Sequence, residues 1–281
     1  MNLTFKCIFS AAAALLAASA TSATPFAGMW ELASGTGGLT FSGDALSALS
    51  ASGSSVVTVG TVPTIAGLDI SGATNTALYT KATGNVSLAF NSAIVTGDTV
   101  NSLRAANSFV NIRRTVFNDD DTLTTRSIFM ANFDVNLSTS TIFADLYSRL
   151  GNGALVNYGK QAIFTADVPG VIGGTQGNIL IDGYVDYTVS AHASGSLAGS
   201  LRMNGNTATV ILADLGLSTA ATDPVAILVR TSNWGSTQAE GVFRVACLDC
   251  IPPFPEPSTY AMFGVGLLAM GVAVRRRGKA G

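Results

Sequence analysis

The stretch Ala131-Asn-Phe-Asp-Val-Asn-Leu137 alternates apolar and polar side chains at every position. Successive side chains of an extended strand point to opposite faces of a sheet, so the apolar residues of this stretch share one face and the polar residues share the other. We predict a strand with one buried and one solvated face, which is typical of antiparallel sheets.

The same alternation extends through much of the chain. Val86-Ser-Leu-Ala-Phe-Asn91 repeats it, Val110, Ile112 and Val116 share one face of another run, and Ser55-Val-Val-Thr-Val59 is a short β-like segment. Amphipathic helical periodicity is sparse in this part of the chain. We therefore predict a mainly β body, built as an antiparallel β-sandwich or jelly-roll-like domain.

One short helix is expected inside this body. Asp44 precedes the run Ala45 to Ala51, and a carboxylate at that position can accept hydrogen bonds from the first backbone N–H groups of a helix.

Two segments predict hairpin turns. Asn118-Asp-Asp-Asp121 lies between two strand-like runs, and Met203-Asn-Gly-Asn206 contains Asn-Gly, whose residues tolerate the positive φ of a two-residue hairpin. Thr141-Ile-Phe-Ala-Asp-Leu146 and Val210-Ile-Leu-Ala-Asp-Leu215 also echo each other. A duplicated β-unit would produce this echo.

Composition excludes nucleic-acid binding and favours an exported β-protein. Charged residues make up 11% of the chain and its net charge is -2, so it lacks the basic stripe that nucleic acid requires. Hydrophobic residues make up 48%, which is enough for a core. The remaining surface is neutral and rich in hydroxyl and amide groups, as in extracellular proteins that meet glycans or each other.

Both ends of the chain carry export signals that can be recognised without homology. Lys6 and the amino terminus precede an apolar run from Cys7 to Ala18, followed by small residues, which is the order of a secretory signal peptide. We expect this signal peptide, which spans residues 1–23 at its longest, to be removed, so that the mature chain begins at Thr21 or Thr24.

The C-terminal end predicts a membrane segment. Residues 258–274 are uncharged and would be about 26 Å long as a helix, slightly short of a bilayer core of about 30 Å. Arg275, Arg276 and Arg277, with Lys279 behind them, are retained on the cytoplasmic side, which leaves the body outside the inner membrane.

The segment ahead of this helix is expected to be an exposed spacer, because proline cannot donate a backbone hydrogen bond and holds the chain extended. Its prolines are Pro252, Pro253, Pro255 and Pro257.

Pro255-Glu256-Pro257, the apolar run and the arginine cluster together resemble the PEP-CTERM sorting tail of Gram-negative bacteria. This resemblance covers less than a tenth of the chain. It implies recognition and cleavage near these three residues by a membrane protease-transpeptidase called an exosortase, with transient anchoring in the inner membrane. It also implies a setting of exopolysaccharide production and biofilm, and it says nothing about the fold of the body.

Only Cys247 and Cys250 remain after the signal peptide is removed. An oxidising periplasm favours a disulfide between them. Pairing requires a turn at Leu248-Asp249, because three residues of extended chain would separate the two Cα atoms by about 10 Å. A thioredoxin-like role needs a βαβ context and a structural zinc site needs four ligands, so we expect a local clip.

The body shows no catalytic, metal or cofactor constellation that its spacing would identify. His192, the only histidine, is expected in a surface loop, and Asp119, Asp120 and Asp121 in a solvated turn. Exposed aromatic residues could stack on sugars, although such residues more often pack in cores. The candidates are Trp30, Trp234, Tyr184 and Tyr187.

The sequence thus predicts a signal peptide over 1–23, a β-rich extracellular domain over 24–250, and a spacer with sorting tail over 251–281. The tail holds an apolar transmembrane helix over about 258–274 and a basic end over 275–279. The leading hypothesis is a non-enzymatic surface or extracellular-matrix protein. The alternatives are a membrane-anchored periplasmic glycan-binding module and an extracellular polysaccharide hydrolase, which would need two carboxylates about 5 to 10 Å apart.

Overall fold

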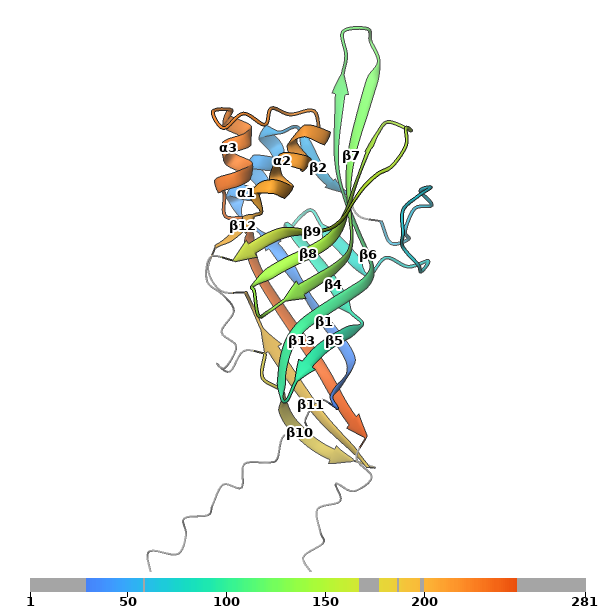
Figure 1. Cartoon of the computed structure of the whole chain (residues 1–281), viewed down its shortest axis with the longest axis vertical. Coiled ribbons are helices and arrows are strands. Elements are labelled where there is room, and N and C mark those ends of the chain that lie inside the picture. Colours follow the sequence, from blue (N-terminus) through green and yellow to red (C-terminus); the bar gives the residue numbers. More distant parts are fainter. Residues whose placement is uncertain (1–28, 58, 167–176, 186, 198–199, 247–281) are drawn as a thin grey trace, which may run out of the picture.

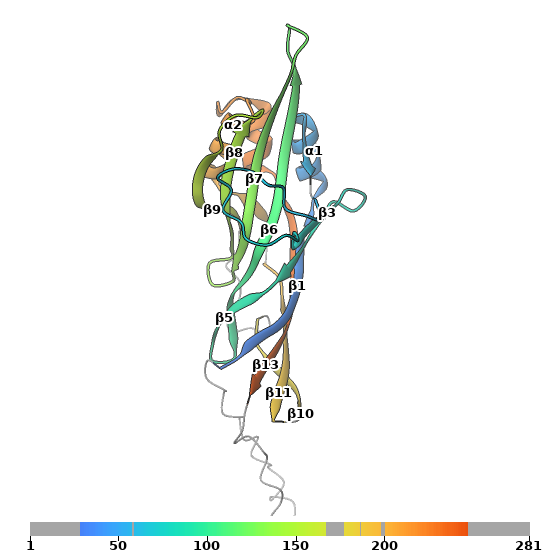
Figure 2. The same cartoon turned by 90° about the vertical axis from the view of Figure 1, so that its right-hand side faces the viewer.

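Two antiparallel sheets pack face to face around one core in the computed structural model (Figures 1 and 2). The structure describes residues 29–57, 59–166, 177–185, 187–197 and 200–246. In order across the sheet, sheet 1 consists of β10 (Leu180–Val185), β11 (Thr188–Gly195), β13 (Gly235–Ala246), β1 (Glu31–Phe41), β4 (Asn85–Phe90) and β3 (Ala77–Thr80).

Sheet 2 consists, in order, of β12 (Leu201–Met203), β9 (Val156–Ala166), β8 (Thr141–Leu150), β7 (Leu123–Asn136), β6 (Thr99–Phe117) and β2 (Ser54–Val57). A further strand, β5 (Ser92–Thr96), pairs with β6. The mainly β, antiparallel prediction is confirmed. The two sheets curl around the shared core. The structure therefore confirms the fold class, but not the specific sandwich or jelly-roll-like packing that the sequence predicted.

The stretches that alternate apolar and polar residues form strands, as predicted. Ala131, Phe133 and Val135 on β7 are buried, as are Val86 and Leu88 on β4. The core between the sheets is closed by side chains that are almost completely excluded from solvent: Ile128, Leu146, Ile163, Leu201, Leu212 and Phe243.

Strands β1 and β13 bring the two ends of the described chain together. They pair antiparallel from Glu31 opposite Arg244 to Phe41 opposite Gly235, with one bulge between Leu32 and Ser34. The start of β1 and the end of β13 therefore lie at one pole of the elongated body, and the β6–β7 hairpin extends from the opposite pole (Figure 1).

Helices α1 (Gly43–Ala51), α2 (Gly205–Asp214) and α3 (Pro224–Thr231) gather beside β2 and β12 (Figure 1). The prediction of α1 is confirmed, but its cap is not Asp44. Ser42 is the N-cap, and its hydroxyl accepts a hydrogen bond from the backbone N–H of Ala45 at 3.1 Å. Asp44 lies one residue inside the first turn, where its charge suits the helix dipole.

The predictions of a hairpin at Asn204-Gly205 and of a duplicated β-unit are wrong. Asn204 has φ -60° and caps α2 through its side-chain oxygen, which accepts from the N–H groups of Asn206 and Thr207. Because the residue keeps a negative φ, the tight hairpin turn does not form. Residues 210–215 consequently lie in and just after a helix, whereas residues 141–146 lie in β8. The turn at Asn118–Asp121 is confirmed as the tip of the β6–β7 hairpin.

The predicted signal peptide, Cys247, Cys250 and the whole sorting tail fall outside the described residues. Within the described ranges, none of the helices has the length and apolar character needed to cross a bilayer.

Close approach of β1 and β13 depends on Gly235. Its φ is +141°, and a Cβ at this position would lie 2.0 Å from the carbonyl oxygen of Thr40. We predict that Gly235→Ala lowers the free energy of unfolding by about 3 kcal/mol, from backbone strain and the collision together. Urea denaturation of the purified protein measures this loss.

Gly43→Ala provides the matched control. A Cβ on Gly43 meets nothing within 4 Å, and alanine is the better helix former, so this variant should be equal to the wild type or up to about 1 kcal/mol more stable. Equal urea midpoints for Gly235→Ala and the wild type would refute the steric argument.

Candidate functional site

The outer face of sheet 1 carries two adjoining hollows, which we call the outer trough. Their volumes are about 470 Å³ and 390 Å³, and both include Thr36 and Glu240 in their walls. The larger hollow spans β13, β1, β4 and β3, and the smaller spans β11, β13 and β1. The trough therefore crosses five strands.

Strand register places the trough side chains in parallel rows. Ser194, Glu240, Thr36 and Ala89 occupy neighbouring positions across β11, β13, β1 and β4. The next row is Gln238, Gly38, Ser87 and Leu78 across β13, β1, β4 and β3. Because side chains two residues apart share a face, these rows point outward while their neighbours on each strand enter the core.

Gly38 keeps the floor of the trough low. A Cβ here would lie 2.4 Å from the carbonyl oxygen of Val86, so only glycine fits between β1 and β4 at this position. The missing side chain leaves room above the strand.

Many polar side chains of the trough retain their hydrogen-bonding capacity. Seven of them are exposed and form no side-chain hydrogen bond to another described residue: Ser34, Thr36, Thr40, Ser87, Ser194, Gln238 and Glu240. Some surface hydroxyls elsewhere are bonded, as at the β6–β7 hairpin, where the Asn118 amide nitrogen donates to the hydroxyls of Thr122 and Thr124. The trough thus gathers on one face several side chains that form no such hydrogen bond.

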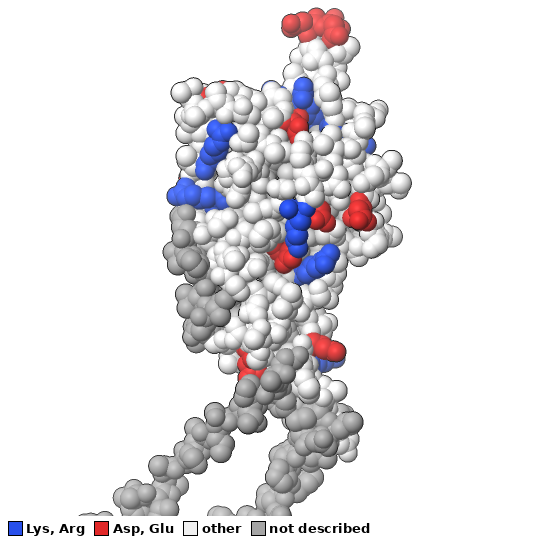
Figure 3. All heavy atoms as spheres, in the orientation of Figure 1, with Lys and Arg blue, Asp and Glu red and all other residues white. Residues whose placement is uncertain are grey.

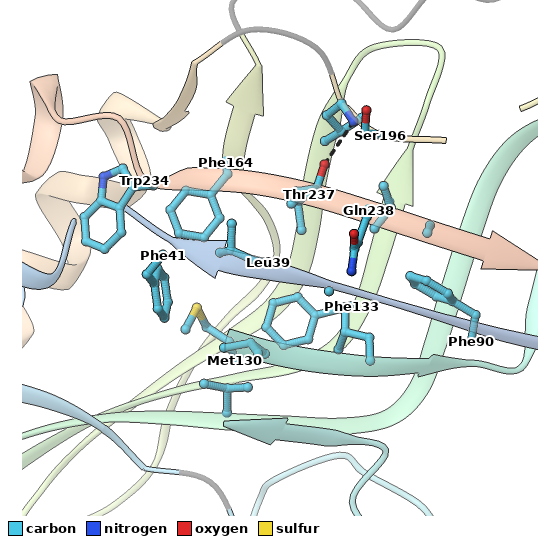
Figure 4. Close-up of a pocket in the computed structure, with 18 of the residues that line it drawn as sticks. Leu39, Phe41, Phe90, Met130, Phe133, Phe164, Ser196, Trp234, Thr237 and Gln238 are labelled. Carbon is cyan, nitrogen blue, oxygen red and sulfur yellow. Dashed lines mark hydrogen bonds between the residues drawn. The ribbon is translucent and has the colours of Figure 1, made fainter. Parts of the chain in front are cut away.

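A separate, internal cavity lies between the two sheets (Figure 4). It has a volume of about 60 Å³ and is lined almost wholly by apolar side chains, with Phe133, Met130 and Leu39 among them. Thr237 and Gln238 lie at one side of it, where the Thr237 hydroxyl accepts from the backbone N–H of Leu197 at 2.9 Å. Apolar cavities of this kind can stay dry in proteins.

The outer face of sheet 2 is covered in part by the segment between β2 and β3. Phe109 and Phe129 stack there with ring centroids 5.6 Å apart, beside the buried Tyr147. Asn75 fastens the segment to β6: its amide nitrogen donates to the Phe109 carbonyl oxygen, and its oxygen accepts from the Phe109 N–H, both at 2.8 Å. This face is structural.

The sequence-predicted candidates do not converge on one site. His192 lies on β11 rather than in a loop, and its Nδ1 is within hydrogen-bonding distance of the Asp182 carboxyl group. Its side chain is half exposed and lines the smaller hollow of the trough. Asp119, Asp120 and Asp121 form the exposed acidic tip of the β6–β7 hairpin, on a surface that otherwise carries few charges (Figure 3).

The aromatic candidates are mostly core residues. Trp30 and Trp234 are buried, and the Trp234 ring packs 5.4 Å from that of Phe164. Tyr184 packs partly buried against the core, and Tyr187 is exposed. Throughout the ranges that the structure describes, no three His, Cys, Asp or Glu side chains gather closely enough to hold a metal ion.

The comparisons with known proteins concern the tail and the fold separately. Residues 255–277 match the family described as the PEP-CTERM protein-sorting motif, which confirms the resemblance of the tail. The motif implies export and sorting by an exosortase. No curated protein matches the sequence.

Among solved structures, the chain is similar to the C-terminal domain of HtaA from Corynebacterium glutamicum, with 10% identity and a TM-score of 0.37 over 76% of this chain and 99% of that one. A likeness at this level supports no argument about function.

Sequence reasoning missed the trough, although part of its signal is visible. In Ser236-Thr-Gln-Ala-Glu-Gly-Val242, Gln238 and Glu240 alternate with small residues, which is the pattern of a strand with one polar face. Which strands would lie beside it cannot be read from this segment.

Burial of Tyr147 makes the stability of the sheet 2 face pH-dependent. Burial raises the pKa of the Tyr147 hydroxyl above its usual value of about 10, and the negative charge of Asp145 adds to the rise. The folded state therefore favours the neutral phenol, so its stabilisation is present below pH 10 and is lost as the pH rises toward the raised pKa.

We predict that the urea midpoint of the wild type falls above pH 10 and that Tyr147→Phe shows a smaller fall, because phenylalanine has no proton to lose. Tyr187→Phe, at a side chain that is 53% exposed, is the control. Identical alkaline profiles for the wild type and Tyr147→Phe would rule out this contribution.

Proposed function

We propose that the chain is an exported, non-enzymatic surface or extracellular-matrix protein that an exosortase sorts and cleaves through its tail. We further propose that the mature protein associates with exopolysaccharide in a biofilm. The match of residues 255–277 to the sorting motif is the observation that carries this proposal.

The position of the tail relative to the fold supports cleavage without loss of structure. Strand β13 ends at Ala246, and the motif begins at Pro255. Cleavage near Pro255, Glu256 and Pro257 would therefore remove no strand and no core residue of the described body. A cut that leaves every described strand in place suits a temporary membrane handle.

Two of the described carboxylates already have side-chain partners, which fits a non-enzymatic body. Lys160 pairs with Asp134 at 2.5 Å, and the Tyr158 hydroxyl donates to Asp214 at 2.6 Å. Glu240 is the only acidic residue among those that line the trough. Glycoside hydrolysis ordinarily uses a pair of carboxylates, so the hydrolase alternative has no support there.

The unused hydrogen-bonding groups of the outer trough suit glycan binding, which a permanently anchored glycan-binding module, the alternative, would share with the first proposal. This alternative differs from the first proposal in the fate of the tail. An anchored protein stays with membranes after a high-salt wash, whereas a processed one reaches the cell surface or medium.

Mass spectrometry of the extracellular form tests the proposal. We predict that this form lacks Arg275, Arg276 and Arg277, and that replacement of Pro255, Glu256 and Pro257 by alanine leaves the full tail on a membrane-bound chain. The double replacement of Pro252 and Pro253 by alanine is the matched control and should be processed normally. An extracellular form that ends in the intact arginine cluster would contradict the proposal.

A further inference from the structure

We propose that the outer trough binds a neutral, linear polysaccharide segment of about four sugar residues, laid across the strands of sheet 1. This inference deepens the proposed function, since it names the surface and the ligand class through which the protein would meet exopolysaccharide.

The dimensions of the trough suit an extended sugar chain. Neighbouring strands of a sheet lie about 4.8 Å apart, which is close to the length of one pyranose residue, and a crossing of five strands spans about 19 Å. A chain lying across β3, β4, β1, β13 and β11 would therefore meet a new strand with each sugar.

The chemistry of the walls suits hydroxyl groups. Sugar hydroxyls both donate and accept, and so do the hydroxyls of Thr36, Ser87 and Ser194 and the amide of Gln238. Because these side chains form no hydrogen bonds to other described residues, ligand binding would break no bond within the protein. The bonds to the ligand would replace bonds to water only.

Each hollow also offers one aliphatic contact for the apolar face of a sugar ring. Leu78, 52% exposed, lies in the wall of the larger hollow, and Val242, 40% exposed, lies in that of the smaller. An ordinary solvated strand face does not require either side chain to be apolar.

Charge selects a neutral ligand. No Lys or Arg lines either hollow, so an anionic polysaccharide would find no lysine or arginine to pair with. Glu240, where the two hollows meet, would repel it, whereas its carboxylate accepts strong charge-assisted hydrogen bonds from neutral hydroxyls.

Binding of defined oligosaccharides to the purified protein tests the inference by calorimetry. The neutral probes are cellohexaose, maltohexaose, laminarihexaose and chitohexaose, and the anionic probe is hexagalacturonic acid. We expect at least one neutral probe to bind with a dissociation constant below about 1 mM and the anionic probe not to bind. Failure of all four neutral probes at millimolar concentration, or equal binding of the anionic one, would overturn the inference.

Matched arginine variants locate the binding. Thr36→Arg fills the junction of the two hollows and Ser87→Arg narrows the larger one, and each should weaken binding at least tenfold. Thr115→Arg places the same side chain on an exposed strand threonine of the β6–β7 hairpin and should bind as the wild type does. Glu240→Gln, which keeps the shape, should weaken binding severalfold. Wild-type affinity in both Thr36→Arg and Ser87→Arg, with circular dichroism unchanged, would exclude the trough.

The two proposals fail separately. Oligosaccharide binding is measured on the purified chain whether or not its tail has been removed, so a retained tail leaves the trough testable. A correctly processed protein that binds no neutral probe would refute the trough and leave sorting intact.

Discussion

The antiparallel pairing of β1 with β13 is the contact on which the rest of the molecule depends. It joins the first and last strands of the described body. Its formation therefore carries the entropic cost of closing a loop of nearly the whole domain. Ten paired positions and the close approach at Gly235 hold it together. The same contact sends both ends of the body to one pole and aligns Thr36 with Glu240 at the centre of the outer trough.

This geometry separates the two tasks that the chain combines. The sorting motif follows the last strand as an appendage, and the hydrogen-bonding surface lies on the strands themselves. The core beneath is apolar and nearly full, with a cavity of only about 60 Å³. The larger hollows of the described body lie at the surface, where sheet 1 offers unbonded polar groups and sheet 2 is partly covered.

Alternation predicted the strands well, because one buried face imposes a period of two on residues such as Val86 to Phe90 and Ala131 to Val135. The turn prediction failed at Asn204-Gly205, because the same local sequence suits either a hairpin turn or a helix cap. There the spacing of Thr207, Ala208, Ile211 and Leu212, all buried on one side of α2, was the signal that decided the outcome. The trough was beyond prediction because its rows join strands that lie as far apart in sequence as Thr36 and Glu240, and only register brings them together.

Hydrogen exchange of the backbone amides, followed by mass spectrometry on the full chain and on the processed chain, tests the central claim most directly. We predict that amides of β1 and β13 exchange only through global unfolding, at the same rate in both forms. Faster local exchange in either strand, or a loss of protection after removal of the tail, would contradict it.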